Sequence, residues 1–375
     1  MEYKKADLKP DEKACLKLRG LYEQYGYRKY KMSKFEEYSL YAENKDFLGT
    51  DKVITFTDLD GRLLALKPDV TLSIIKNTQA EPANNEKLYY LENVYRESRE
   101  SHTFKEINQM GLEYIGRVDD YCITEVIALA AQSLKTISED YILEFSHMSF
   151  VVEMLESLQV PEHIKLKLVS LIRDKNADGI RRIAESAGLS TLQIESLCRL
   201  PFLYGQVEPT VKEAKKICLN GAMERALKEL TAIYRALCAM GLADNIQIDL
   251  SIVNDIDYYN GIIFKGYVKE LGKSILAGGQ YDQAMSRLGK KAEAIGFALY
   301  LNEINRISWE KKEFDVDAVL LYPAESDVAD VARAVCSLQE NGASVRAEQE
   351  LPQNIRFREL YILENGALKR EEVSC

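Results

Sequence analysis

KLYYLENVYRESRESHTFKEINQMGLEYIG, residues 87–116, contains two neighbouring predicted β-strands. The residues from Lys87 to Arg96 include many of the Tyr, Leu and Val side chains that suit a β-strand, and Ile107 to Ile115 predict a partner strand. The polar residues between the two predict a connecting loop. We therefore expect an antiparallel pair at the centre of the molecule.

Short turn signals and helical spacing extend this pair into a fold. Asp60-Gly61, Asn260-Gly261 and Gly272-Lys273 each lie next to apolar runs and predict three further hairpins, because tight turns need positive φ. Apolar residues at helical spacing predict helices over 10–26 and 124–134. The expected class is α+β, an antiparallel sheet flanked by helices.

Changes in character along the chain predict its domains. We expect a core over residues 1–312, which contains a helical insertion at about 152–240 where leucines and charges recur at helical spacing. Residues 313–375 predict a short α/β unit, with a helix from Asp327 to Gln339 between two strands.

Composition excludes several classes of protein. The 375 residues carry a net charge of −10 and no long Lys/Arg run, which argues against tRNA or DNA as the main partner. Seven scattered cysteines without a CxxC pair predict free thiols in a reducing cytosol and no zinc site. Neither a signal peptide nor an apolar run of the roughly 18 residues that span a membrane is evident. We expect a soluble, cytoplasmic protein.

Familiar catalytic signatures are missing. The sequence has no P-loop, GxGxxG, HExxH or GxSxG, and its three histidines, His102, His147 and His163, lie far apart. A histidine-based triad or metal site is therefore not expected, and no cofactor is predicted.

Polar residues on predicted strands indicate a candidate binding site. Gln109 and Glu113 are four residues apart, so in a strand they face the same side. Asp69 adds a carboxylate, and Tyr258 and Tyr259 add aromatic rings. Carboxylates could hold an amino group while tyrosines flank a ring. On composition and spacing alone, solvated strand residues and turn glycines remain the commoner explanation of such a pattern.

Four segments, in this order, resemble class II histidyl-tRNA synthetases and their paralogues, the regulatory subunits of ATP phosphoribosyltransferase. They cover about residues 10 to 310. They are Lys67-Pro68-Asp69-Val70-Thr71; Glu92 to Arg96 with Gln109 to Gly116; Asp257 to Gly261; and Gly278 to Asp282 with Gly296-Phe297-Ala298.

The resemblance implies a histidine-binding pocket and a possible phosphate contact. The histidine-binding positions of the family fall on a set of residues spread over the first three segments. Arg96 is the retained arginine that implies the phosphate contact. The pocket residues are Asp69, Thr71, Gln109, Glu113, Tyr258 and Tyr259.

Departures from the synthetase pattern separate the two branches. An arginine that assists amino-acid activation is replaced by Asn254, and the ATP-binding arginine of motif 3 is replaced by Glu303, an anion expected to repel the triphosphate. Thr103 stands where motif 2 has another arginine, and Ser33 where motif 1 ends in proline. The C-terminal unit looks truncated relative to an anticodon-binding domain.

These losses imply a non-catalytic regulatory subunit, whose partner is a short-form ATP phosphoribosyltransferase catalytic subunit in the first step of histidine biosynthesis. The resemblance also implies a homodimer and histidine as a possible effector. Two alternatives stay open: a divergent histidyl-tRNA synthetase, and a free-standing histidine-binding pseudo-synthetase.

Overall fold

The computed structural model describes residues 8–45, 48, 52–98, 101–253, 259–307, 313–340 and 342–371. It divides into two compact units, Met1–Ile307 and Ser308–Cys375. The division falls five residues before the end of the core expected at residue 312. Each unit has its own hydrophobic core, so each is described separately.

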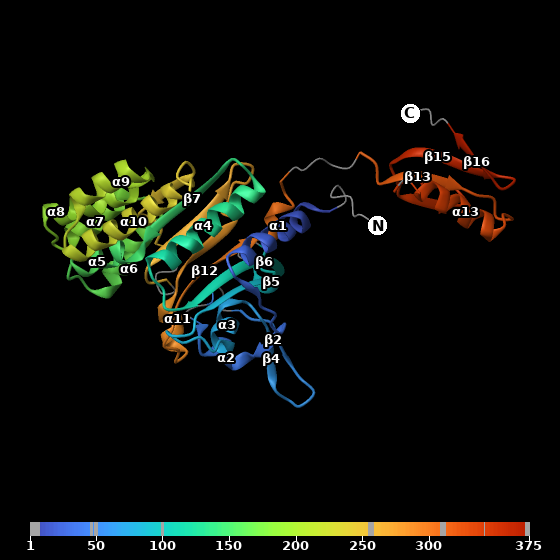
Figure 1. Cartoon of the computed structure of the whole chain (residues 1–375). Coiled ribbons are helices and arrows are strands. Elements are labelled where there is room, and N and C mark those ends of the chain that lie inside the picture. Colours follow the sequence, from blue (N-terminus) through green and yellow to red (C-terminus); the bar gives the residue numbers. More distant parts are fainter. Residues whose placement is uncertain are drawn as a thin grey trace. The chain divides into compact units, whose positions relative to one another are not determined.

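A nine-stranded sheet forms the centre of the first unit (Figure 1), in the order β1-β5-β6-β12-β11-β10-β7-β9-β8. The quoted stretch forms its two longest strands, which pair antiparallel as predicted. The bounds are β1 Arg28–Lys29, β5 Glu86–Glu97, β6 Phe104–Gly116, β7 Tyr141–His147, β8 Tyr204–Gln206, β9 Ile246–Asp249, β10 Ile262–Val268, β11 Leu276–Gln280 and β12 Glu293–Tyr300.

The α+β class is confirmed, but the sheet is mixed. Two of its pairs, β1 with β5 and β7 with β9, are parallel. A parallel pair needs a long crossover connection, and the helical insertion between β7 and β9 supplies one. An expectation built from hairpin turns alone does not include this crossover.

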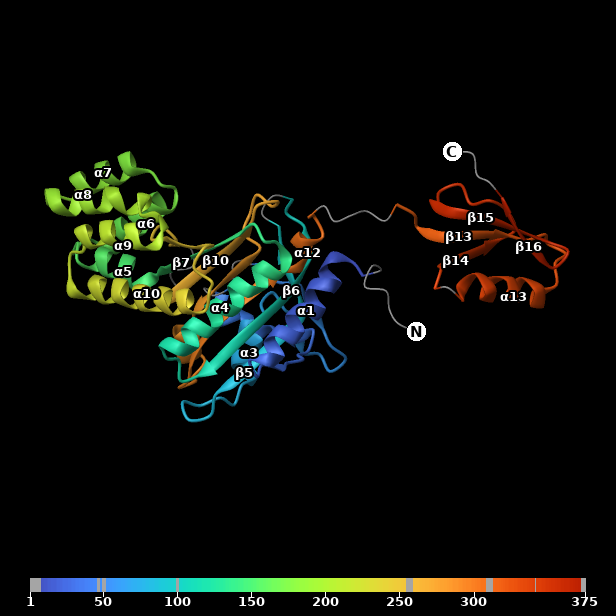
Figure 2. The same ribbon diagram turned by 45° about the horizontal axis from the view of Figure 1, so that its top comes forward.

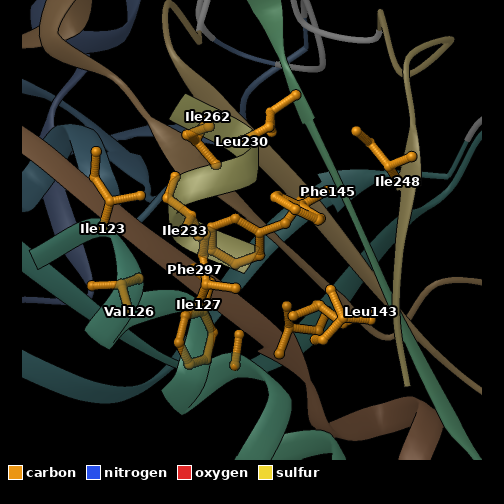
Figure 3. Close-up of a cluster of buried hydrophobic side chains, with 14 of the residues drawn as sticks. Ile123, Val126, Ile127, Leu143, Phe145, Leu230, Ile233, Ile248, Ile262 and Phe297 are labelled. Carbon is orange, nitrogen blue, oxygen red and sulfur yellow. The ribbon is translucent and has the colours of Figure 1, made fainter. Parts of the chain in front are cut away.

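Two helices, α1 (Pro10–Gln24) and α4 (Asp120–Ile137), cover the back face of the sheet (Figures 1 and 2). Figure 3 shows Ile123, Val126 and Ile127 of α4 near Phe145 and Phe297 of the sheet. All five are almost completely buried. Burying such apolar surface is the dominant favourable term in folding, so this layer fixes the sheet on which the front-face residues stand.

The insertion is a bundle of helices beside β7 (Figure 2), and its buried side chains share one hydrophobic core with the sheet. His147, at the end of β7, accepts a hydrogen bond from Ser149 N and lies 3.1 Å from Glu229 of α10. The elements of the insertion are α5 Met148–Glu156, α6 Glu162–Arg173, α7 Ala177–Ser186, α8 Thr191–Arg199, η3 Leu200–Phe202, α9 Val207–Ala214, η4 Lys215–Ile217 and α10 Gly221–Ala239.

Shorter elements cover part of the front face. A three-stranded sheet has the order β2-β4-β3, α2 contacts β2 and β4, and α3 contacts α11. Their bounds are β2 Phe35–Glu37, α2 Tyr38–Ala42, β3 Thr55–Thr57, β4 Leu63–Leu66, α3 Thr71–Asn77 and α11 Asp282–Arg287. The short helix α12, Leu301–Ile304, contacts β6 and α1 instead.

Two of the three predicted hairpin turns are present. Asp60-Gly61 joins β3 to β4, and Gly61 has the positive φ of 81° that the turn needs. Gly272-Lys273 lies between β10 and β11, which pair antiparallel. The prediction for Asn260-Gly261 is wrong: the two residues lead into β10, whose neighbours are β11 and β7 and not β9. Asn260 instead bonds to Asp282 through its side chain.

The second unit has one helix and a four-stranded sheet of order β14-β13-β15-β16. The strand–helix–strand pattern expected there is present, with β13 and β14 parallel. Its buried core consists of Leu320, Ala334 and Leu363. The bounds are β13 Val316–Leu321, α13 Val328–Gln339, β14 Val345–Glu348, β15 Phe357–Glu364 and β16 Ala367–Glu371. In the described part of the chain, no helix is both long and apolar enough to cross a membrane.

Candidate functional site

The candidate site lies on the front face of the sheet, where β6 meets α3 and the segment before α11. Side chains alternate along β6, so Gln109 and Glu113 both face this side. Glu113 pairs in register with Gly296 of β12, which pairs with Gly279 of β11. Gly279 and Gly296 therefore occupy the middle of this face, and we call these two residues the glycine floor.

Glu113 is the deepest group of the site, with an exposed fraction of 2%. Thr71 Oγ1 donates to its Oε1 at 3.2 Å, and the Tyr281 hydroxyl donates to its Oε2 at 2.7 Å. Burial raises the pKa of Glu113 to about 8, against the lowering effect of these two hydrogen bonds, and the nearby charge of Asp69 adds to the rise. The carboxyl is thus held in place by two donors, and its burial favours the protonated form.

The glycine floor makes room for these side chains. A Cβ atom on Gly296 would overlap Glu113 Oε2, and one on Gly279 would come within 2.7 Å of the Tyr259 ring. Atoms that close must shift, so neither position accepts a side chain without moving Glu113 or Tyr259. The two glycines are therefore part of the site's construction.

Asp69 forms the second carboxylate of the site. Its Oδ1 accepts a hydrogen bond from Leu72 N at 2.8 Å, and its Oδ2 lies 3.2 Å from Arg96 Nη2. Arg96 Nε also donates to the carbonyl of Pro68 at 2.6 Å. Arg96, the possible phosphate contact, therefore uses its guanidinium to orient Asp69 and the start of α3.

A buried ion pair supports this corner from below. Lys67 has a side chain with no exposed surface, and its Nζ donates to Glu92 Oε2 at 2.6 Å and to Ser33 O at 3.1 Å. The pair joins the residue that follows β4 to β5, two positions before Asp69 in the chain. Ser33, which stands where motif 1 of the synthetases ends in proline, accepts the second of these hydrogen bonds through its carbonyl oxygen.

Tyrosines lie beside the two carboxyl groups. Burial raises the pKa of the fully buried Tyr90, and the charges of Glu113 and Asp69 raise it further. Tyr90 therefore lies near both carboxyls. Tyr259 packs against two clusters of buried residues. We use the name amino-acid pocket for a set of residues at four of which the resemblance predicts histidine binding: Asp69, Thr71, Glu113, Tyr259 and Tyr281.

Most of the predicted pocket residues come together. Thr71 bonds to Glu113, Asp69 pairs with Arg96, and Tyr259 stands beside Gly279. Gln109 is 3% exposed and faces the same side, but it lies four residues along β6, opposite Glu92 and Tyr300. Tyr258 and Asn254 lie outside the described residues.

Sequence reasoning missed Tyr281, Tyr90 and the role of Gly296. Tyr281 stands inside the quoted segment from Gly278 to Asp282, so a signal for it existed. Tyr90 belongs to a strand whose alternation places it on the same face as Gly111, its partner in register on β6. Only the paired register of β6 and β12 shows that Gly296 lies under Glu113.

Glu303 was expected to repel the triphosphate as an anion, but in the structure it is paired with two cations. Lys273 Nζ lies 2.8 Å from its Oε1 and Arg306 Nη1 3.0 Å from its Oε2. Burial pulls the pKa of Glu303 upward, but the hydrogen bonds from Lys273 and Arg306 outweigh it and leave the pKa below the usual range. We call these three residues the α12 ion-pair cluster. The change from arginine removes an available cation there, and the anion that replaces it is already neutralised.

Thr103, which matches an arginine of motif 2 in the synthetases, carries a hydroxyl in place of a cation. Thr103 is exposed at the start of β6, and its hydroxyl bonds to that of Ser101 at 2.8 Å. Across the part of the chain that the structure describes, no group of three or more His, Cys, Asp or Glu side chains could hold a metal ion.

The family model described as Histidyl-tRNA synthetase matches residues 2–304. This chain belongs to the histidyl-tRNA synthetase family. The match spans the nine-stranded sheet, the insertion and the pocket, and it ends in α12.

Proteins named ATP phosphoribosyltransferase regulatory subunit are similar to this chain over most of its length. The ATP phosphoribosyltransferase regulatory subunit of Bacillus cereus (strain AH187) is 28% identical over 344 residues, which is 88% of this chain and 80% of that protein. The protein of the same name from Alkaliphilus metalliredigens (strain QYMF) is 27% identical over 93% of this chain and 90% of its own length.

Solved structures agree on the fold. An ATP phosphoribosyltransferase regulatory subunit/histidyl-tRNA synthetase from Bacillus halodurans has a TM-score of 0.79 at 24% identity, with 94% of this chain and 93% of that chain covered. A chain of the ATP phosphoribosyl transferase complex from Thermotoga maritima has a TM-score of 0.61 at 18% identity, with 80% and 98% covered.

Proposed function

We propose that this chain is the non-catalytic regulatory subunit of ATP phosphoribosyltransferase. It works with a short-form catalytic subunit in the first step of histidine biosynthesis. The observation that carries the proposal is a contrast within the synthetase-like core. Glu113 accepts hydrogen bonds from Thr71 and Tyr281, whereas Glu303, at the position that matches the ATP-binding arginine of motif 3, is paired with Lys273 and Arg306. The regulatory subunits from Bacillus cereus and Alkaliphilus metalliredigens support the same reading.

Histidine is the proposed effector, and the pocket is its proposed site. Asp69 and Glu113 provide carboxyl groups for an ammonium and a ring nitrogen, and Tyr259 and Tyr281 border the space between them. Gln109 and Tyr258 belong to the same proposed set. A histidine that binds one state of the complex more tightly, by about 1–3 kcal/mol, would lower transferase activity about 5- to 150-fold.

The assembly is part of the proposal. The chain forms a homodimer through its synthetase-like core, binds the catalytic subunit, and does not take tRNA as its main partner. A cytoplasmic location fits the six described cysteines, which are all free thiols.

Co-purification with the short-form catalytic subunit tests the proposal. Phosphoribosyl transfer from phosphoribosyl pyrophosphate to ATP is measured with and without this chain, and with and without histidine. We expect a stable complex, activity that depends on the chain, and inhibition by histidine. A catalytic subunit that neither binds the chain nor changes rate in its presence would exclude the regulatory role and leave a free-standing histidine-binding protein as the better reading.

A further inference from the structure

A second pocket lies at the end of the nine-stranded sheet, where β1 and β5 begin. Its volume is about 470 Å³, which falls in the range of small-molecule sites. Its residues belong neither to the amino-acid pocket nor to the α12 ion-pair cluster. The side chains that line it are Arg28, Asn84, Asn85, Glu86, Lys87 and Tyr114.

Lys87 supplies a cation whose position is fixed by its neighbours. Its Nζ donates to Glu125 Oε1 of α4 at 2.7 Å and to the carbonyl of Tyr25 at 3.3 Å. The same nitrogen lies 5.2 Å and 5.8 Å from the ring centroids of Tyr27 and Tyr114. An ammonium has three N–H donors, and the two hydrogen bonds leave one of them for a ligand in the pocket.

Arg28 supplies a second cation at the rim. Its side chain is 70% exposed, and the ion-pair partner that the described residues give it is Glu86, whose Oε1 lies 3.7 Å from Arg28 Nη2. That distance is too long for a hydrogen bond. The guanidinium therefore keeps its donors for an anion such as a phosphate, which arginine binds through two N–H groups at once.

The amide and carboxylate groups of the pocket suit hydroxyl groups. Asn85 Oδ1 accepts a hydrogen bond from Arg117 N at 3.0 Å, so the amide nitrogen of Asn85 remains as a donor. Asn84 is exposed beside it. Glu86 Oε2 accepts a hydrogen bond from Thr78 Oγ1 at 2.9 Å, which leaves Oε1 as an acceptor on the pocket side. A hydroxyl can donate to the carboxylate and accept from an amide.

We propose that this pocket binds a phosphorylated sugar. The phosphate lies between Arg28 and Lys87. The sugar hydroxyls bond to Glu86 and to the amides of Asn84 and Asn85. A bare anion would face the like charge of Glu86, and a cationic ligand would face Arg28 and Lys87. The lining therefore favours a ligand that carries an anionic group together with hydroxyl donors.

The inference goes beyond the proposed regulatory role and does not depend on it, because it concerns this chain alone. Successive side chains of a strand point to opposite sides. Glu113 of β6 belongs to the amino-acid pocket, and the next residue, Tyr114, lines the second pocket. The two sites therefore lie on opposite sides of one strand and are distinct.

Calorimetry on the purified full chain tests the inference, with ribose 5-phosphate, ribose and inorganic phosphate titrated in parallel. We expect saturable binding of ribose 5-phosphate that weakens as salt is added, because salt screens exposed charges. Ribose and inorganic phosphate should each bind at least about tenfold more weakly, since each makes only part of the contacts. Equal affinity for inorganic phosphate would show a general anion site and overturn the sugar assignment. No saturable binding of ribose 5-phosphate up to about 10 mM would overturn the whole inference.

Three variants locate the site. Arg28→Gln should weaken ribose 5-phosphate binding about tenfold or more, because a charge-assisted hydrogen bond is lost. Arg19→Gln is the matched control, since Arg19 is also exposed but is paired with Glu23 on α1, and it should bind as the wild type does. Asn84→Ala should weaken the binding of ribose 5-phosphate but not that of inorganic phosphate. Equal affinities of Arg28→Gln and Arg19→Gln for ribose 5-phosphate would place the ligand elsewhere and overturn the inference. Binding at this pocket by a chain that does not affect the transferase would leave the inference standing and exclude the regulatory role.

Discussion

The amino-acid pocket and the α12 ion-pair cluster belong to one synthetase-like core, but their glutamates have different partners. In the pocket, the carboxyl of Glu113 is buried against two hydroxyls that donate hydrogen bonds to it. In the cluster, Glu303 is paired with two cations, Lys273 and Arg306. A carboxyl that is buried without a cation differs in its electrostatics from one that is paired on both oxygens, and the proposed function depends on this difference.

The largest expected effect tests whether the cluster still handles phosphate. We expect histidine-dependent ATP–pyrophosphate exchange at least about 10⁴-fold below that of a working synthetase, because each lost stabilising group costs about 10²–10³ in rate. Glu303→Arg alone should not restore it, since Thr103 also lacks a cation. Exchange within tenfold of an authentic synthetase, assayed in parallel, would refute the assignment.

The next effect concerns the ion pair beneath the pocket. Lys67→Met leaves Glu92 without a partner at 15% side-chain exposure, and we expect a loss of about 3–5 kcal/mol in the free energy of unfolding. Urea denaturation measures it. Lys76→Met is the matched control, because the side chain of Lys76 is 39% exposed and Glu36 keeps a hydrogen bond from Ser73, so the loss should be about 1 kcal/mol or less. Equal losses would mean that Lys67 is not a buried support.

The glycine floor gives a smaller effect on stability and a sharp one on binding. Gly296→Ala places a methyl group against Glu113 and the Leu112 carbonyl, so we expect about 1–3 kcal/mol of destabilisation and loss of histidine binding. Gly272→Ala points into open space and should change neither property. Thermal denaturation and calorimetry measure the two. Retained histidine binding in Gly296→Ala would place the effector elsewhere, such as a subunit interface.

The smallest effect is expected in the α12 ion-pair cluster. Lys273→Met removes one partner of Glu303 at a lysine that is 54% exposed, and the cost should lie between about 0 and 1 kcal/mol. Histidine inhibition of the complex should be unchanged. A shift of the inhibition curve beyond threefold would show that the cluster still communicates with the pocket, and the contrast drawn above would weaken.

The sequence predicted the parts of the fold that depend on local pattern. Alternation and turn chemistry located β5, β6, β10 and β11, and helical spacing located α1 and α4. The crossover from β7 to β9 was not predictable in this way, because parallel pairing depends on contacts far apart in the chain. Asn260-Gly261 shows the same limit: the pair has the chemistry of a hairpin turn, yet Asn260 bonds to Asp282 from a distant segment.

In the candidate site, too, local pattern and motif likeness predicted some residues, whereas tertiary contacts determine the others. Gln109 and Glu113 share a face because strand periodicity requires it, and the motif likeness supplied Asp69, Thr71 and Tyr259. The bond from Tyr281 to Glu113 links residues 168 positions apart in the chain, and the clash under Gly296 needs the strand register. The ion pair of Glu303 also depends on Lys273, which lies in the turn between β10 and β11. Partners of this kind follow from tertiary packing, which a single sequence does not display.

The separate core of the second unit has a consequence for cooperativity. Leu320, Ala334 and Leu363 form a buried cluster of their own, so we expect the second unit to unfold as its own block. A small core buries little apolar surface, and its transition should absorb correspondingly little heat. Calorimetry on the whole chain should therefore show two melting transitions, which a single unfolding temperature would not describe.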